Sequence, residues 1–165
     1  MIAADMTLRF GSLRVPTTVH WPGVETVSLA LVLTDELSPT DPWVEGFVVV
    51  GLAAGMPGSI ELEALRWVSE HVGELGAESD RMLVAGGARA ARLALATRDR
   101  GWPVLQRQLL VHPAFGLKHP MPANVAGAPP ATVVFRSQHD MGRRYAARLR
   151  AADVDVQEVR DAGER

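Results

Sequence analysis

Short apolar runs of strand length alternate along this chain with segments whose apolar residues recur at helical spacing. The predicted strands are Thr7–Phe10, Arg14–Trp21, Val27–Thr34, Phe47–Leu52, Arg81–Ala85, Leu105–Val111, Ala131–Ser137 and Val154–Val159. Val27–Thr34 and Phe47–Leu52 are apolar almost without interruption, which is typical of strands buried on both faces of a sheet.

Three segments between these strands have the period of an α-helix. The first runs from Ile60 to about Gly73, and Ser59 directly before it is the residue type that caps a helix N-terminus. The second is Ala88–Asp99 and the third is Gly142–Ala152. The Pro- and Gly-rich connection His112–Pro130 predicts no regular element.

The order of these elements predicts an α/β fold with a mostly parallel sheet, because parallel neighbours must be joined by crossover connections. Helices on both faces would make it a three-layer α/β/α sandwich. A length of 165 residues is enough for one domain with a real core, so residues 1–165 are expected to form a single domain.

Composition excludes several classes of function. The net charge of −2 gives no general attraction to nucleic acid or to an anionic membrane. The absence of cysteine excludes disulfides, a thiol nucleophile and thiolate zinc sites. No apolar run approaches the ~20 residues of a membrane-spanning helix. The first residues include Asp5 and show no basic region followed by an apolar block, so we expect no secretory signal and a cytoplasmic protein.

Several phrases of the sequence match one known family. They are Ala64-Leu65-Arg66-Trp67-Val68, Ser79–Gly86, the helix Ala88–Asp99 with Arg100-Gly101, Leu109–Pro113, Ala128-Pro129-Pro130-Ala131, His139-Asp140 and Tyr145–Ala152. Through them the chain resembles the hormone-sensitive-lipase-like branch of the α/β-hydrolases, which contains carboxylesterases and lipases. The match has almost no gaps from Glu63 to Pro113, and with gaps it extends from Val27 to Gly163.

The resemblance implies a minimal α/β-hydrolase fold. In the family, the segment that corresponds to His112–Pro130 carries helices that cap the substrate pocket. Here this connection is short, so the resemblance implies a fold without a cap and without the family's C-terminal helix. Apolar surface exposed in this way could be covered by a second copy or by another protein.

The family's nucleophile is a serine in a sharp Gly-x-Ser-x-Gly turn between a strand and a helix. The matching residues here are Gly86-Gly87-Ala88-Arg89-Ala90. Ala88 therefore stands at the nucleophile position, and its methyl group cannot attack a carbonyl carbon.

Other parts of the family's catalytic machinery are also changed. A His-Gly-Gly-Gly loop supplies the oxyanion hole in the family, whereas this chain has Thr34-Asp35-Glu36-Leu37-Ser38-Pro39, with two carboxylates that would repel a developing negative charge. The family's acid matches Asp140, and its histidine would follow the last strand, where this sequence ends at Arg165 without one. The resemblance therefore implies a protein that does not work as an ordinary esterase, in which Asp140 is a loop carboxylate with no histidine to orient.

Two other groups of residues are candidate binding sites. Gly86, Gly87 and Arg89 begin a helix and could hold an anion on free N–H groups and a guanidinium, unless the glycines only form a turn and Arg89 points to water. His112 and His139 follow neighbouring strands, at the edge where ligands bind in open α/β sheets.

His112, His139 and Asp140 could in principle bind a divalent metal. Asp35 and Glu36 follow a strand at the same edge of the sheet. They form no compact ligand motif, so we expect solvated loop residues, no metal and no cofactor. A relocated nucleophile, with Ser38 or Ser137 paired to His139, is an alternative.

The sequence thus predicts a catalytically inactive α/β-hydrolase-like protein that acts as a binding or assembly module. Its expected partner is a second copy or a full-length α/β-hydrolase, and the final strand Val154–Val159 would lie at a sheet edge able to pair across a dimer. The alternatives are a hydrolase of small acyl esters with a non-standard site, and a binder of small anions or other small molecules at Gly86–Arg89.

Overall fold

The computed structural model describes residues 2–23 and 28–162. Its strands are β1 (Ile2–Phe10), β2 (Leu13–Trp21), β3 (Leu29–Leu33), β4 (Val48–Leu52), β5 (Met82–Gly86), β6 (Arg107–Val111), β7 (Ala131–Phe135) and β8 (Val156–Arg160). Its helices are α1 (Gly58–Glu70), α2 (Ala88–Arg100) and α3 (Met141–Ala151), with the short 3₁₀ helices η1 (Pro42–Val44) and η2 (Ser79–Arg81). Val27, the first residue of a predicted strand, and Gly163, the last residue of the family match, lie outside the described residues.

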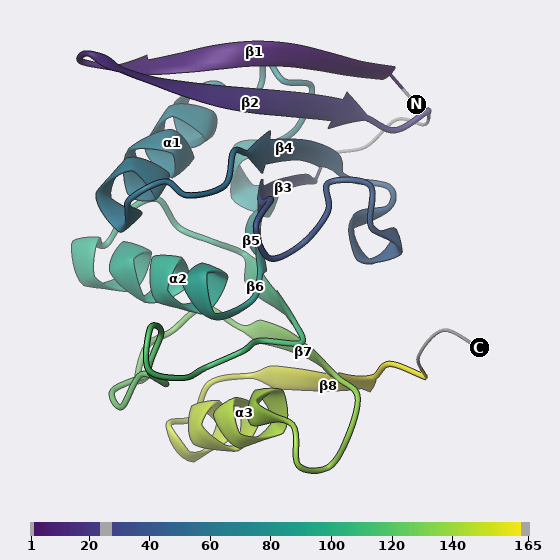
Figure 1. Cartoon of the computed structure of the whole chain (residues 1–165), viewed down its shortest axis with the longest axis vertical. Coiled ribbons are helices and arrows are strands. Elements are labelled where there is room, and N and C mark those ends of the chain that lie inside the picture. The colour runs from purple at the N-terminus through teal and green to yellow at the C-terminus, as the bar shows by residue number, and fades with distance from the viewer. Residues whose placement is uncertain (1, 24–27, 163–165) are drawn as a thin grey trace.

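All eight strands form one twisted sheet in the order β1-β2-β4-β3-β5-β6-β7-β8 (Figure 1). β1 and β2 form an antiparallel hairpin, and β2 is antiparallel to β4. All remaining pairs are parallel. The predicted α/β class with a mostly parallel sheet is confirmed.

The three central strands are buried along their whole length. Every residue of β3, β4 and β5 is buried, as the continuous apolar runs predict. The interior position of these three strands follows from this pattern, because strands that are apolar on both faces have the most to gain from burial inside the sheet.

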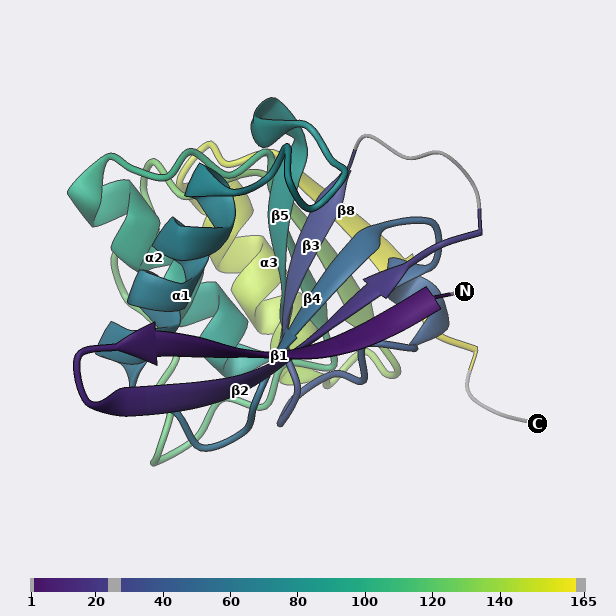
Figure 2. The same cartoon turned by 90° about the horizontal axis from the view of Figure 1, so that it is seen from above.

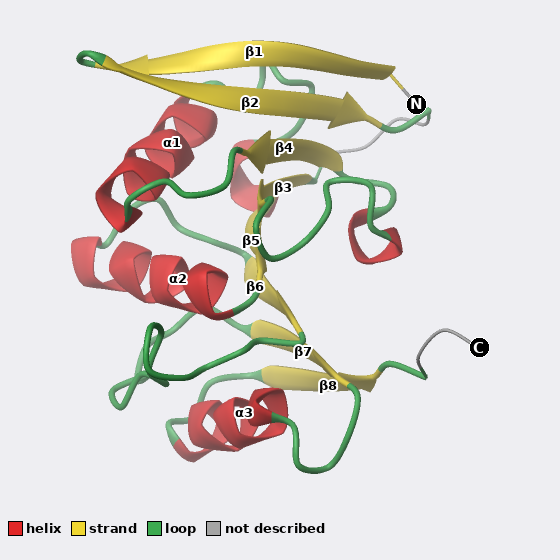
Figure 3. Ribbon diagram, in the orientation of Figure 1, coloured by secondary structure: helices red, strands yellow, loops and turns green. Residues whose placement is uncertain are grey.

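The three α-helices lie on one face of the sheet (Figures 1 and 2). They share one hydrophobic cluster with the side chains of alternate strand positions, and the fully buried Leu65, Leu110 and Tyr145 belong to it. Figure 3 shows these helices in red beside the yellow strands. Among the described residues, no helix is both long enough and apolar enough to cross a membrane.

The opposite face is covered differently from the expected second helical layer. Its cluster contains Ala30, Val32, Val49 and other strand residues, and the residues that cover it include Leu37 and Val44 of the β3–β4 connection. In the described residues this connection forms η1 and no α-helix. The helices share one face because the β4–β5, β5–β6 and β7–β8 connections that contain them all cross in the same direction along the sheet, and right-handed crossovers then lie on the same side.

Helix α1 begins one residue before the predicted cap. Pro57, not Ser59, occupies the N-cap position, and no side chain caps this end. The Pro57 carbonyl accepts hydrogen bonds from the N–H groups of Ile60 (2.9 Å) and Glu61 (3.1 Å). Ser59 therefore lies inside the first turn, where its hydroxyl cannot act as the N-cap acceptor.

Candidate functional site

The turn from β5 into α2 carries the residue at the family's nucleophile position. β5 ends at Gly86, Gly87 is the N-cap, and α2 begins at Ala88. Ala88 is only 2% exposed. Its methyl group faces protein rather than solvent, so the position provides neither a nucleophile nor an open approach for a substrate carbonyl.

The N-terminus of α2 holds the carboxylate of Glu36, which comes from the loop after β3. One Glu36 oxygen, Oε2, accepts a hydrogen bond from the Gly87 N–H (2.5 Å) and a longer one from the Ala90 N–H (3.3 Å). The other oxygen, Oε1, accepts from the Arg89 N–H (2.6 Å). Free N–H groups and the helix dipole both favour a negative charge here, and the chain supplies that charge itself.

Gly86 and Gly87 make room for this carboxylate. A Cβ atom at Gly86 would lie 2.6 Å from Glu36 Oε2, closer than non-bonded atoms can approach. At Gly87 the corresponding distance to the Glu36 carboxyl carbon is 3.4 Å. The glycines predicted as an anion site do surround an anion, and that anion is a side chain of the same protein.

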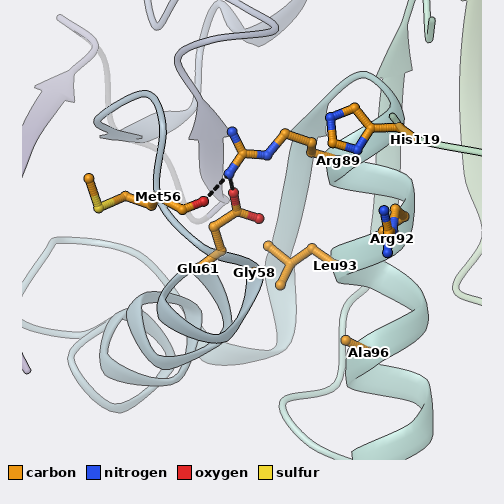
Figure 4. Close-up of a pocket in the computed structure, with 8 residues that line it drawn as sticks. All are labelled: Met56, Gly58, Glu61, Arg89, Arg92, Leu93, Ala96 and His119. Carbon is orange, nitrogen blue, oxygen red and sulfur yellow. Dashed lines mark hydrogen bonds and ion pairs between the residues drawn. The ribbon is translucent and has the colours of Figure 1, made fainter. Parts of the chain in front are cut away.

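Arg89 does not point to water. Its guanidinium forms ion pairs with Asp35 and Glu61 and donates a hydrogen bond to the Met56 carbonyl. Figure 4 shows one guanidinium nitrogen, Nη2, joined both to the Met56 carbonyl oxygen and to the Glu61 carboxylate. The Arg89 and Glu61 side chains are 15% and 5% exposed, so this cation is committed to protein partners.

A cavity of about 390 Å³ adjoins Arg89 on the helical face of the sheet. Arg89 and Glu61 form one wall of it, and Arg92 and Leu93 of α2 form another (Figure 4). His119 from the β6–β7 connection also lines it.

Asp140, the position that matches the family's catalytic acid, caps a helix. Its Oδ1 accepts a hydrogen bond from the Gly142 N–H (2.8 Å) at the start of α3. Its Oδ2 accepts from the Arg136 N–H (3.1 Å). Both oxygens therefore stabilise the β7–α3 turn, which is a structural role.

The two histidines predicted at the carboxyl edge have different surroundings. His112 Nε2 lies 2.9 Å from Asp161 Oδ2, just after β8. His139 is exposed in the turn before α3. Within the described ranges, no group of three or more His, Cys, Asp or Glu residues could hold a metal ion.

The sequence did not single out Asp161 as a partner for His112. The available signal was its position directly after the last strand, because the carboxyl ends of parallel strands meet at one edge. His112 and Asp161 line a cavity of about 400 Å³ together with Glu36, Ser38 and Arg136. Ser137, the other serine considered as a relocated nucleophile, is not among the residues that line it.

Solved structures of esterases superpose on nearly the whole chain. A thermostable carboxylesterase cloned from a metagenomic library matches with a TM-score of 0.81 and 21% identity, over 99% of this chain and 79% of its own. An esterase from Pyrobaculum calidifontis matches with a TM-score of 0.81 and 19% identity, over 97% of this chain and 74% of its own. This chain has the α/β-hydrolase fold. An arylesterase matches with a TM-score of 0.80 and 17% identity, over 97% of this chain and 75% of its own.

The resemblance predicted from the sequence is thus confirmed at the level of the fold. No protein-family model matches the sequence, and no curated protein matches it. In this α/β-hydrolase fold the β6–β7 connection, residues 112–130, contains no helix or strand. The connection therefore adds no helical cap above the sheet, as expected from its length.

Proposed function

We propose that this chain is a non-hydrolytic protein of the α/β-hydrolase fold that acts as a binding or assembly module. The observation that carries the proposal is the Glu36 carboxylate on the N–H groups of Gly87, Arg89 and Ala90. An acyl transfer at this turn would need both a nucleophile and N–H donors for the oxyanion. Ala88 provides no nucleophile, and the donors already bind a carboxylate.

Charge strengthens this argument. Asp35, Glu36 and Glu61 all lie around the beginning of α2, and Arg89 is the cation that pairs with two of them. A tetrahedral intermediate here would place another negative charge beside these carboxylates, and like charges at short range are unfavourable. Replacing Ala88 by serine alone would therefore not restore an oxyanion hole.

A hydrolase of small acyl esters with a different site is the second candidate. The observation that favours it is the His112–Asp161 pair, with 2.9 Å between Nε2 and Oδ2, in a cavity that Ser38 also lines. A histidine oriented by a carboxylate can act as a general base. The rate of such a reaction would depend on His112 and would not change when Ala88 is substituted.

Hydrolysis of p-nitrophenyl acetate and butyrate separates the two candidates. We expect the wild-type protein and Ala88→Ser to hydrolyse these esters no faster than a heat-denatured control. An active esterase of the same fold, measured in parallel, serves as the positive control.

Two outcomes would contradict the proposal. Wild-type turnover that His112→Ala abolishes would establish the second candidate instead. Turnover by Ala88→Ser alone would show that Glu36 leaves the oxyanion position available. An Asp140→Ala variant serves as the control, because its carboxylate caps α3 and should not affect either readout.

A further inference from the structure

The outer edge of β1 is a nine-residue strand with no neighbour on one side. β1 pairs with β2 in unbroken register, from Ile2 opposite Trp21 to Phe10 opposite Leu13. In the described sheet it is the terminal strand. Such an edge presents a row of backbone N–H and C=O groups that another strand can bind.

The residues whose backbone groups face outward follow from Pro16. Thr7 lies opposite Pro16, which has no N–H and whose carbonyl accepts a hydrogen bond from the Ala53 N–H on the far side of β2 (3.1 Å). Pro16 therefore exchanges no hydrogen bonds with Thr7. Because hydrogen-bonded and non-hydrogen-bonded pairs alternate in an antiparallel ladder, the outward-facing residues are the odd-numbered ones, including Thr7 itself.

The exposed side chains of the same residues include two charges of opposite sign. Asp5, Thr7 and Arg9 are exposed, whereas Met6, Leu8 and Phe10 pack toward the core. Arg9 lies directly opposite Arg14 of β2, and like charges at such positions are destabilising. None of the ion pairs in the described part of the chain includes Asp5, Arg9 or Arg14.

We propose that two copies of this chain associate through antiparallel pairing of their β1 strands, about a twofold axis at Thr7. Thr7 then lies opposite Thr7 of the second copy, and each Asp5 lies opposite Arg9 of the other copy. On the core side, Met6 lies opposite Leu8, so apolar side chains also continue across the axis. The two sheets join into one.

Charge selects this register among the possible ones. In any such pairing, each odd-numbered residue must lie opposite an odd-numbered residue of the second copy, because only these residues have backbone groups that face outward. A twofold axis at Asp5 or at Arg9 places two like charges opposite each other. Axes midway between Thr7 and either residue place each charge opposite a neutral residue. The axis at Thr7 forms two Asp5–Arg9 pairs and brings a carboxylate to the Arg9–Arg14 cross-strand pair.

The opposite edge of the sheet suits such pairing less well. β8 has five residues, and Arg150 donates a hydrogen bond to the Val156 carbonyl on it (3.2 Å). Glu158 of β8 already pairs with Arg143 and Arg150. The final strand predicted from the sequence as a pairing edge is thus shorter and partly capped, which favours β1.

This inference names a partner for the assembly role and rests on the proposed function only in that respect. Sedimentation measures the association, and the ester assay measures hydrolysis. A monomer without activity would overturn the dimer alone, and an active dimer would overturn the non-hydrolytic role alone.

The first experiment is sedimentation velocity over a concentration series, with circular dichroism to verify the fold of each variant. We expect a dimer for the wild-type protein. Asp5→Arg and Arg9→Asp should each raise the dissociation constant of the dimer at least about tenfold, because each makes two like-charge pairs. An equimolar mixture of these two variants should dimerise again, since each carries the charges that complement the other.

A second experiment tests the register. The chain contains no cysteine, so Thr7→Cys introduces a single thiol beside the proposed axis. Directly opposite residues lie about 5.5 Å apart between Cα atoms, which a disulfide can span. We expect Thr7→Cys to form a disulfide-linked dimer on mild oxidation, and Asp5→Cys to form much less of it.

Three results would overturn the proposal. They are a wild-type chain that sediments as a monomer across the series, a folded dimer that survives both charge reversals, and equal cross-linking of the two cysteine variants.

Discussion

The replacement of Glu36 by alanine tests whether the N-terminus of α2 depends on the carboxylate that the β3 loop supplies. Three N–H groups donate to this carboxylate, two of them at 2.5 and 2.6 Å. A hydrogen bond to a charged group contributes about 1.5–3 kcal/mol, and the helix dipole adds a further fraction of 1 kcal/mol. Water can reach part of the freed turn, because Glu36 is half-buried.

We therefore expect Glu36→Ala to lower the free energy of unfolding by about 2–3 kcal/mol, less than the sum of its bonds. Glu36→Gln keeps the shape and one acceptor oxygen, so it should lower this free energy by about 1 kcal/mol. Urea denaturation measures both. Glu74→Ala is the matched control, because Glu74 is exposed in the turn after α1, and it should stay within about 0.5 kcal/mol of the wild type.

Acetate provides a direct readout of the vacated site. If the three N–H groups hold a carboxylate, added acetate should raise the melting temperature of Glu36→Ala more than that of the wild type. Sodium chloride at the same ionic strength corrects for general salt effects. A Glu36→Ala variant as stable as Glu74→Ala, with no specific response to acetate, would refute the reasoning.

Three further substitutions probe other parts of the structure. Arg89→Ala should lower the free energy of unfolding by about 3–5 kcal/mol, because it leaves Glu61, which is 4% exposed, without a countercharge; adding Glu61→Leu should recover more than half of the loss in a double-mutant cycle. Asp140→Ala should lower it by about 1 kcal/mol through loss of the α3 cap, measured by urea denaturation with α3 otherwise intact. Burial raises the pKa of Tyr145 from 10.0 to about 12, so its contribution to stability is complete below pH 10 and is lost as the pH rises through 12. That contribution is about 3 kcal/mol, and urea midpoints from pH 10 to 12 should fall more steeply for the wild type than for Tyr145→Phe. Because the chain has one tyrosine, its phenolate absorbance reports the same titration, and a midpoint near 10 would contradict the burial argument.

The central strands and the main helices could be predicted from the sequence because their signals are local. Continuous apolar runs identify β3 and β4, and helical spacing identifies α1. One short motif, Gly86-Gly87-Ala88-Arg89-Ala90, likewise identifies Ala88 as the residue that matches the family's nucleophile. Such features depend on neighbours within a few residues, so no knowledge of the tertiary structure is needed.

Two features of the backbone differ from the predictions. The helices lie on one face of the sheet because the connections that contain them all cross in the same direction along it. Pro57 takes the cap position assigned to Ser59. The strand order decides the first feature, and the second lies in a loop where hydrophobic periodicity gives no information.

The order of the strands in the sheet determines which side chains meet at the N-terminus of α2. β3 lies beside β5 in the sheet, so the loop after β3 meets the helix that follows β5, and Glu36 reaches the N–H of Gly87 across 51 positions of sequence. Asp161 follows β8, two strands along the sheet from β6, and it reaches His112 because both residues lie at the carboxyl edge. The sequence by itself determined that alanine stands at the position that matches the family's nucleophile and that two acids, Asp35 and Glu36, directly follow a central strand. Only the tertiary structure decided that one of those acids binds the helix N-terminus, because that contact exists only when β3 and β5 are neighbours.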